Sequence, residues 1–227
     1  MSLPATPEEV WDAVASTAGT AAWQFPTQIA PDGSDAAVWD PPHRYAVREQ
    51  DGEWFNAVEY VIEGRDGGTT LLRYMHSGIF MDDWDNQYDA VQQHTDFYLH
   101  TLSEYLAHFK GRQATYIGRA PAGLQGPPAS ADRDGFTRLK AALGVDEQAR
   151  EGDRISLTAG DLPPRSATID YLRPNFVGLR TSDGLYRFFG RNAFGAPVGM
   201  SAHMFSGGPN PAQAAQTWQA WLDRALA

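Results

Sequence analysis

The chain has 227 residues, no cysteine and a formal net charge of −10 at pH 7. The lack of cysteine excludes disulfide scaffolds, thiolate nucleophiles, iron–sulfur clusters and cysteine zinc sites, and the acidity disfavours nucleic acid and anionic lipid as partners. With 42% hydrophobic and 12% aromatic residues, the chain can bury a core in one large domain or in two of roughly 100 residues each.

The first half is predicted to begin with a helix and to continue with strands. Residues 6–9, Thr-Pro-Glu-Glu, form a capping box that predicts a helix ending at Gly19. Strands are predicted at 45–47, 54–62 and 69–77, and a glycine-rich hairpin turn at 64–68 joins the last two. Alternation along the hairpin gives one inner face, which carries Asn56, Val58, Tyr60, Ile62, Leu72, Tyr74 and His76.

A long amphipathic helix is predicted over 84–109. Apolar and aromatic residues recur there at spacings of three and four, so they form one stripe along about seven turns. At about 1.5 Å per residue the helix would be about 39 Å long. A helix of that length can lie across an entire small sheet.

The second half is predicted to repeat this order in compressed form. A linker rich in proline, glycine and alanine is expected at 113–134, with one short strand possible at 114–118. Beyond it we predict a helix at 136–143, strands at 154–157, 167–172, 176–180, 185–189 and 197–205, and a terminal helix at 212–226. The pentapeptide at 74–78 is echoed at 203–207, and with the matching element order it favours a two-fold repeat of domains 1–112 and 135–227.

Several segments resemble a known family. Residues 3–13, with the sequence LPATPEEVWDA, resemble the opening of the SRPBCC or START-like helix-grip proteins, in the branch related to the activator of the heat-shock-protein-ninety ATPase. The strand at 69–78, the acidic run at 82–85 and the helix at 88–109 resemble that branch's last strand and grip helix. The second half, through IDYLRP at 169–174 and FVGLRT at 176–181, is similar to the degenerate repeat of two-domain actinobacterial members.

This resemblance implies an α+β fold of two tandem helix-grip domains, each a curved antiparallel sheet wrapped around a long C-terminal helix. It also implies a hydrophobic cavity between sheet and helix, in the first domain or shared by both. Two-domain members occur in natural-product gene clusters, including enediyne clusters, which suggests a polyketide or polyene ligand. The family places a full strand before the segment at 4–9, whereas only residues 1–5 precede it here, so the first strand is expected to be truncated.

Combined with the face assignments, the implied cavity gives a set of expected ligand-binding residues. These are aromatic walls and polar tips from loops, strands and helix: Trp23, Trp39, Asn56, Tyr60, Tyr74, His76, Tyr88, Tyr98 and His203. Aromatic walls with a few polar tips suit a flat or linear unsaturated molecule. Plain core packing would place tyrosines on an inner face as well, so both interpretations stay open.

His76 is the candidate for acid–base chemistry, because imidazole titrates near neutrality and could move a proton on a polyketide enol. A structural histidine at the strand end is the competing interpretation. His94, His100 and His108 share the long helix without a carboxylate at matching spacing, so no metal is expected, and no motif indicates a cofactor.

The predicted function is binding of a hydrophobic small molecule in natural-product biosynthesis. The alternatives are a cyclase or aromatase-like enzyme, a self-resistance protein that sequesters a toxic metabolite, and a co-chaperone-like module. No apolar run approaches the roughly 20 residues of a membrane-spanning helix, and no signal peptide opens the chain. We therefore expect a soluble cytoplasmic protein, with a monomer favoured and neither nucleic acid nor membrane as a partner.

Overall fold

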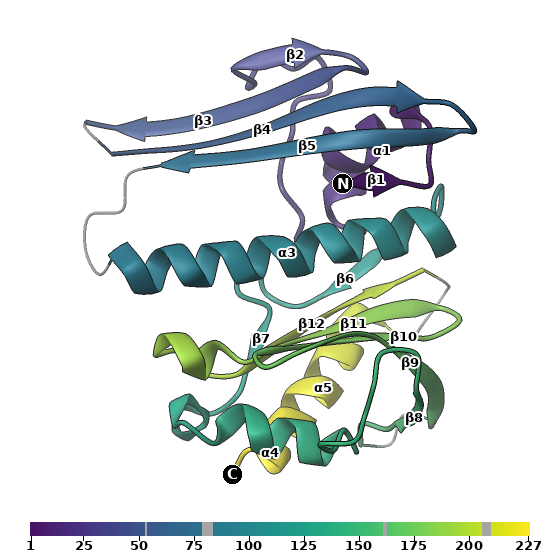
Figure 1. The fold of residues 1–227 in the computed structure, drawn as a ribbon. Coiled ribbons are helices and arrows are strands. Elements are labelled where there is room, and N and C mark those ends of the chain that lie inside the picture. The colour runs from purple at the N-terminus through teal and green to yellow at the C-terminus, as the bar shows by residue number, and fades with distance from the viewer. Residues whose placement is uncertain (53, 79–83, 161–162, 206–209) are drawn as a thin grey trace. The chain divides into compact units, whose positions relative to one another are not determined.

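The computed structural model describes residues 1–52, 54–78, 84–160, 163–205 and 210–227, with the backbone alone at 84–87. The chain divides into two compact units, Met1–Gln113 and Ala114–Ala227. Each unit contains one antiparallel sheet and a helix that follows its last strand (Figure 1). The predicted α+β class with two antiparallel sheets is confirmed.

The first unit is a five-stranded sheet with three helices. Its elements are β1 (Ser2–Leu3), α1 (Pro7–Val14), α2 (Thr17–Thr20), β2 (Val38–Asp40), β3 (Arg44–Asp51), β4 (Trp54–Arg65), β5 (Thr69–Gly78) and α3 (Trp84–His108). The strand order is β1-β5-β4-β3-β2, so the first strand lies beside the last and the others form a meander. β1 has only two residues, and it pairs with β5 through Ser2 and Leu3.

Helix α1 begins where the capping box predicts. The Glu9 amide donates to Thr6 Oγ1 at 3.3 Å, and the Thr6 amide donates to the Glu9 carboxylate at 2.9 Å. Its apolar side, with Val10 and Val14 fully buried, packs toward β4, β5 and α3. These two reciprocal hydrogen bonds satisfy backbone N–H groups that would have no acceptor within the protein if the helix were uncapped.

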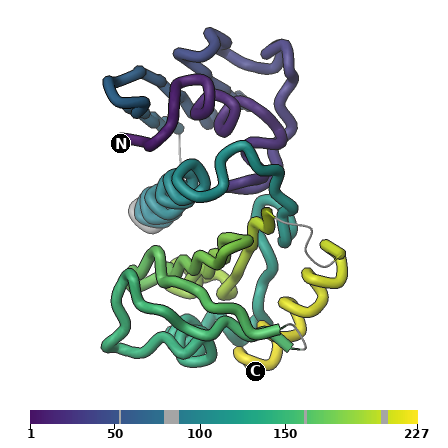
Figure 2. Tube along the Cα trace, turned by 90° about the vertical axis from the view of Figure 1, so that its right-hand side faces the viewer, coloured from purple at the N-terminus to yellow at the C-terminus, as the bar shows by residue number. Residues whose placement is uncertain are grey.

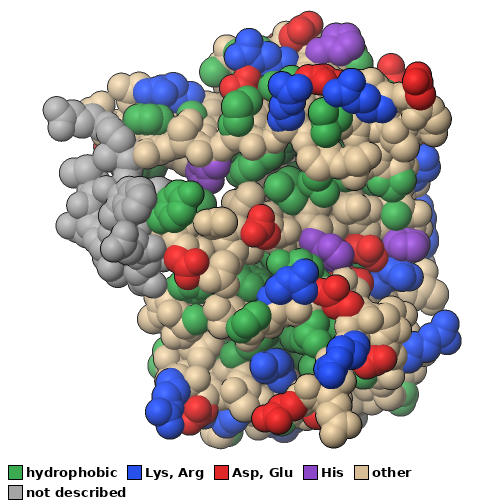
Figure 3. Space-filling model, in the orientation of Figure 1, with side chains coloured by type: hydrophobic (Ala, Val, Ile, Leu, Met, Phe, Trp, Pro, Cys, Tyr) green, Lys and Arg blue, Asp and Glu red, His purple; other side chains and the backbone are tan. Residues whose placement is uncertain are grey.

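Helix α3 runs along one face of the first sheet. Figure 2 looks nearly along its axis and shows it beside the strands, and Figure 1 shows it in side view. Its buried side chains, among them Leu102, Tyr105 and Leu106, recur at the spacing of three and four that predicts the helix. The opposite face of the sheet carries charges: Arg44 pairs with Glu59, and Glu63 pairs with both Arg65 and Arg73. Figure 3 shows acidic and basic side chains interspersed over these strands.

The second unit repeats this strand arrangement. Its elements are β6 (Thr115–Ile117), β7 (Leu124–Gln125), η1 (Pro128–Ala131), α4 (Gly135–Ala142), β8 (Arg154–Leu157), β9 (Arg165–Arg173), β10 (Phe176–Arg180), β11 (Gly184–Phe189), η2 (Arg191–Phe194), β12 (Gly199–Met204) and α5 (Pro211–Ala225). The order is β6-β12-β11-β10-β9-β8, with β7 also paired to β12. Again the first strand lies beside the last, and a helix follows. One core cluster joins the sheet to α4 and α5, where Trp218 contacts Tyr186 and Phe188.

The segment 113–134, for which the sequence predicts a linker with a short strand at 114–118, forms ordered structure that belongs to the second unit from Ala114 onward, and β6 lies within that predicted strand. β6 and β7 both pair with β12, and the Ser130 hydroxyl accepts a hydrogen bond from the Val198 amide at 3.2 Å. The prolines restrict the chain without preventing short edge strands, because an edge strand needs hydrogen bonds on one side only.

Other differences concern short elements and the ends of the repeat. β2 is not predicted by the sequence, and β3 is longer than the predicted 45–47. Asp82 and Asp83 of the acidic run, and residues 206–207 of the second pentapeptide, lie outside the described residues. Among the helices in the described part of the chain, none combines the length and the apolar character needed to cross a membrane.

Candidate ligand-binding site

A cavity of about 250 Å³ lies within the first unit, between α3 and the inner face of the sheet. Strands β4 and β5 provide one wall, helix α3 the facing wall, and the segment after α2 closes one end. The lining residues are Trp23, Gln24, Phe25, Asn56, Val58, Tyr60, Tyr74, His76, Val91, His94, Thr95, Tyr98 and Leu99. Most of these side chains are aromatic or aliphatic, as in sites for apolar small molecules.

The floor of the cavity belongs to an aromatic row that crosses the sheet. Direct cross-strand pairing aligns Trp39 of β2 with Tyr45, Tyr45 with Tyr60, and Tyr60 with Tyr74. The rings touch in sequence, with centroid distances of 5.7, 5.9 and 5.3 Å. Because paired residues in neighbouring strands point to the same face, the row is continuous. Only its Tyr60 and Tyr74 end reaches the cavity.

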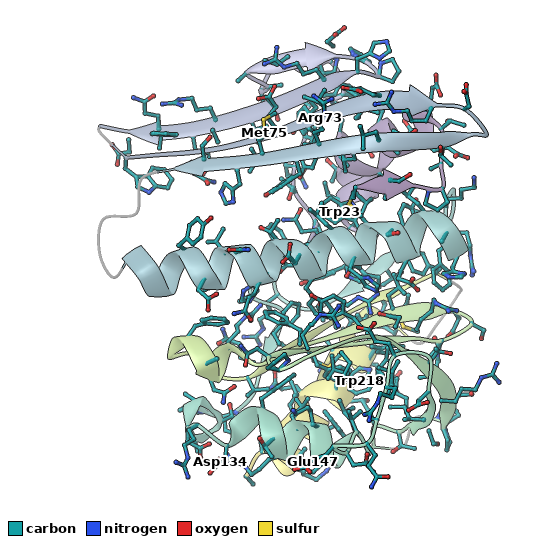
Figure 4. The ribbon with its side chains drawn as sticks, in the orientation of Figure 1. Trp23, Arg73, Met75, Asp134, Glu147 and Trp218 are labelled. Carbon is teal, nitrogen blue, oxygen red and sulfur yellow. The ribbon has the colours of Figure 1, made fainter. Side chains whose placement is uncertain are left out.

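Trp23 forms the deepest part of the wall. Its side chain lies between the sheet and α3, whereas Arg73 and Met75 project from the other side of β5 (Figure 4). The indole is 2% exposed, and its Nε1–H donates to the Ala13 carbonyl at 2.9 Å. This bond satisfies the only polar atom of the side chain, so Trp23 presents an apolar surface to the cavity.

The loop that carries Trp23 is held by backbone amides that donate hydrogen bonds to threonine hydroxyls. Thr20 Oγ1 accepts from the Thr27 amide at 3.2 Å, and Thr17 Oγ1 accepts from the Ile29 amide at 3.0 Å. Phe25, on the same loop, meets Tyr98 of α3 edge to face at 6.2 Å. The loop therefore supplies a fixed end wall.

A polar pair lies at the β5 end of the cavity. His76 Nε2 is 2.6 Å from Asn56 Oδ1, and because an amide oxygen can only accept, Nε2 carries the proton. In the neutral ring Nδ1 is then an acceptor. Desolvation by the surrounding packing lowers the pKa of His76 even though the side chain is partly exposed, and this favours the neutral form.

Burial keeps the side chains of Tyr60 and Tyr74 in their protonated form. Burial raises the pKa of Tyr60 far above its ordinary value, with smaller effects from Tyr74 and Tyr45. Burial also raises the pKa of Tyr74, and its hydrogen bond with Thr95 opposes that shift. At neutral pH these phenols can therefore donate a hydrogen bond to a ligand oxygen but cannot act as bases.

A second hollow of about 320 Å³ adjoins the cavity along α3. It is lined by Tyr74, His76, Gly78, Tyr88, Val91, Gln92, Thr95 and Asp96. Tyr74, His76, Val91 and Thr95 line both spaces. The Tyr74 and Thr95 side chains thus stand between the two hollows.

The structure brings six of the nine expected residues to the cavity: Trp23, Asn56, Tyr60, Tyr74, His76 and Tyr98. Tyr88 lines the adjoining hollow instead. Trp39 lies outside both, because its ring packs on Trp11 at 4.9 Å and on Tyr45. The cavity residues that the sequence did not single out are mainly on α3, where His94 and Thr95 look like the polar edge of a core stripe.

His203 belongs to the second unit and is fully buried in β12. Met200, Ala202 and Met204 face the core of that unit, so His203 points to the opposite face of the sheet, where it contacts Tyr116 at 5.5 Å. The pentapeptide echo aligns His203 with Tyr74, which faces its own helix. An offset of one residue reverses the face of a strand, so His203 does not correspond to Tyr74 in orientation.

Among the described residues, no group of three or more histidine and carboxylate side chains is arranged to hold a metal ion. His94 Nδ1 donates to the Ala90 carbonyl at 2.8 Å, one turn back on α3. His108 Nε2 lies 3.7 Å from the Glu104 carboxylate. The cavity lining itself supplies apolar contacts, hydroxyl and amide groups, and the imidazoles of His76 and His94.

These features define an α+β protein of two units with an aromatic, partly open cavity in the first. No protein-family model matches the sequence, and no curated protein matches it.

Solved structures give distant likenesses over nearly the whole chain. The di-domain ARO/CYC protein BexL from the BE-7585A biosynthetic pathway is 13% identical, with 98% of this chain and 92% of that one covered and a TM-score of 0.40. DynU16, a protein of the dynemicin biosynthetic locus, is 16% identical, with 98% and 94% covered and a TM-score of 0.38. The di-domain ARO/CYC protein StfQ from the steffimycin pathway is 11% identical, with 97% and 91% covered and a TM-score of 0.34. TM-scores this low do not establish a shared fold.

Proposed function

We propose that the first unit binds an elongated, largely apolar small molecule of polyketide or polyene type, as a step in natural-product biosynthesis. The observation that carries this proposal is the cavity of about 250 Å³ walled by Trp23, Phe25, Tyr60, Tyr74 and Tyr98. A concave space lined mainly by aromatic and aliphatic side chains, with a few polar groups among them, is typical of sites that bind small molecules.

The shape of the ligand is suggested by the adjoining hollow. Each space alone is near the lower limit of about 300–1,000 Å³ that sites for drug-sized molecules span. A ligand that moves the Tyr74 and Thr95 side chains apart would occupy both spaces and lie along α3. Aromatic faces on both sides favour a flat, unsaturated chain, and Asn56, His76 and the tyrosine hydroxyls would bind its oxygens.

We further propose that both units are helix-grip domains of the SRPBCC type. In each unit the first strand lies beside the last, the remaining strands return as a meander, and a helix follows the last strand. The two-residue β1 is the shortened first strand that this assignment requires. Long-range nuclear Overhauser contacts from α3 to β4 and β5, and from α5 to β11, would test the assignment through the path of each helix over its sheet.

A fluorescence titration tests the binding proposal. The probe is the methyl ester of parinaric acid, an uncharged conjugated tetraene whose emission rises in apolar surroundings and which accepts excitation energy from tryptophan. Saturable binding to the wild type is expected. Val58→Phe and Leu99→Phe should weaken it at least about tenfold, because each fills the cavity from a different wall. Met75→Phe, on the exposed outer face of β5, is the matched control and should leave the affinity unchanged. Equal affinity in all four proteins would reject the proposal.

A cyclase-like enzyme is a second candidate, and the His76–Asn56 pair is the observation that favours it. Neutral His76 could take a proton at Nδ1 from a carbon between two carbonyl groups. The resulting carbanion would attack a second carbonyl of the folded chain, and the imidazolium would return the proton to the new alkoxide. His76→Phe should then abolish turnover of a poly-β-ketone substrate while ligand binding survives. Unchanged turnover would exclude this role for His76.

A further inference from the structure

A polar hollow of about 440 Å³, distinct from the two spaces of the first unit, lies within the second unit on one face of its sheet. It is lined by Arg154, Arg165, Ser166, Thr168, Arg180, Thr181, Ser182 and Asp183. These residues come from β8, from β9, from the end of β10 and from the turn that leads to β11 (Figure 1). In contrast to the cavity of the first unit, every one of them is polar or charged.

The strand register aligns the centre of this hollow. Arg154 of β8 pairs with Thr168 of β9, and Thr168 pairs with Arg180 of β10. The neighbouring residues Ala167, Ile169 and Leu179 belong to the core cluster, so the row formed by Arg154, Thr168 and Arg180 projects from the other face. Adjacent strands lie about 4.8 Å apart, so the two arginines flank the Thr168 hydroxyl.

The charge balance of the hollow is positive in a strongly acidic chain. Asp183 is the single acid among its lining residues, and it is bound by Arg165 in an ion pair and by the Thr181 hydroxyl at 2.8 Å. The side chain of Arg154 makes no ion pair or hydrogen bond with any residue that the structure describes. Its guanidinium therefore remains available, although the chain as a whole carries ten more acidic than basic side chains.

Hydroxyl groups surround this guanidinium. Within the described part of the chain, the side chains of Ser166, Thr168 and Ser182 make no hydrogen bond to protein atoms. A shallower depression beside the polar hollow shares Arg154, Arg165 and Ser166 with it and continues along the edge strand β8. The face is therefore accessible from solvent. Free hydroxyl donors beside an unpaired guanidinium are the groups that hold a tetrahedral or planar oxyanion.

We propose that this hollow is an anion-binding site of the second unit and that it takes the phosphate or carboxylate group of a small molecule. Arg154 supplies a fork of N–H donors, Thr168 and Ser166 supply hydroxyl donors, and Arg165 keeps Asp183 from repelling the anion. The site shares no residue with the cavity of the first unit, so it does not depend on what that cavity binds.

Titration of the full chain with inorganic phosphate and, separately, with succinate tests the proposal. Backbone and arginine side-chain N–H resonances are followed by NMR, with ionic strength held constant by sodium chloride. We expect saturable shifts at 154–156, 166–168 and 181–183. Saturation by phosphate alone would identify a phosphorylated ligand, saturation by succinate alone a carboxylate, and saturation by both a site for either anion; each result supports the proposal.

Variants distinguish a specific anion-binding site from a general attraction of anions to positively charged side chains. Arg154→Gln and the isosteric Thr168→Val should each weaken binding, the arginine change by about tenfold because it removes hydrogen bonds between charged groups. Arg133→Gln is the matched control, since Arg133 is a highly exposed arginine of the same unit outside the hollow. Linear, non-saturating shifts, or equal weakening by Arg133→Gln, would overturn the proposal.

Discussion

The rings of Tyr60 and Tyr74 meet edge to face at a centroid distance of 5.3 Å, because β4 and β5 pair these two residues directly. Tyr60 is buried in the aromatic row, whereas Tyr74 lines both hollows together with Thr95 of α3. One tyrosine thus belongs to the floor of the cavity, and the other stands at the boundary between the two hollows.

Breaking the ring contact between Tyr60 and Tyr74 should have a measurable cost in stability. We expect Tyr60→Leu and Tyr74→Leu each to lower the free energy of unfolding, because each removes an aromatic ring from the row. The double variant should lose about 0.5–1.5 kcal/mol less than the two single losses combined, since an edge-to-face pair contributes about that much. Urea denaturation followed by tryptophan fluorescence measures all four proteins. Additive losses would contradict a direct contact between these rings.

The inner face of the hairpin could be predicted from the sequence because strand alternation is a strict two-residue period. Val58, Tyr60 and Tyr74 all line the cavity as that period requires. The long helix was equally predictable, since an apolar stripe over 25 residues has no other common explanation.

Features set by long-range pairing could not be predicted. Trp39 and His203 are aromatic residues near expected strands, but only the register shows that Trp39 packs on Trp11 and that His203 points away from its helix. The segment 113–134 has the composition of a linker, and although the sequence indicates a short strand at 114–118, it does not show that β6 and β7 both pair with β12. Such contacts leave no local pattern in the chain.

The protonation of His76 should make stability depend on pH in a defined direction. Desolvation lowers its pKa in the folded state, so between that value and the ordinary value of about 6.5 the unfolded chain binds more protons. The contribution to stability is therefore present above about pH 6.5 and is lost as the pH falls toward the folded-state pKa. His76→Gln should remove this part of the pH dependence.

Two measurements check the pH prediction. Thermal unfolding from pH 5 to 7 should show a smaller loss of Tm on acidification in His76→Gln than in the wild type. An NMR titration of the His76 Cε1–H resonance should give a midpoint below about 6.5. A midpoint above that value would reverse the sign of the effect and contradict the desolvated environment.

The buried ion pair of the second unit should be far more sensitive than an exposed one. Arg187 and Asp170 are joined at 2.9 and 3.0 Å, and their side chains are 1% and 3% exposed. Asp170→Asn leaves the arginine charge buried without its carboxylate, and we expect a loss of about 3–5 kcal/mol in the free energy of unfolding.

An exposed pair of the same unit is the control for this comparison. Asp132 accepts from Arg138 at 3.0 and 3.1 Å, but both side chains are solvent-accessible, so Asp132→Asn should have only a small effect. Urea titrations of the two variants measure the difference. Equal losses would mean that solvent reaches the Arg187–Asp170 pair.

Gly33 should be required by the ring of Trp39 as well as by its own backbone. It has a φ of +69°, and a Cβ atom there would lie 2.1 Å from the Trp39 ring. Gly52 has a similar φ of +58° with no atom within 4 Å of its Cβ position, so Gly52→Ala isolates the backbone cost of about 1 kcal/mol. Gly33→Ala should exceed that cost by about a further 1–3 kcal/mol, because the Trp39 ring must move out of contact with Trp11 and Tyr45.

Circular dichroism near 290 nm, which reports tryptophan packing, should change in Gly33→Ala and not in Gly52→Ala. Because Trp39 lies outside the cavity, the affinity of the folded Gly33→Ala protein for the tetraene ester should stay close to that of the wild type. A large loss of affinity would show that moving the Trp39 ring also shifts Tyr60 and Tyr74.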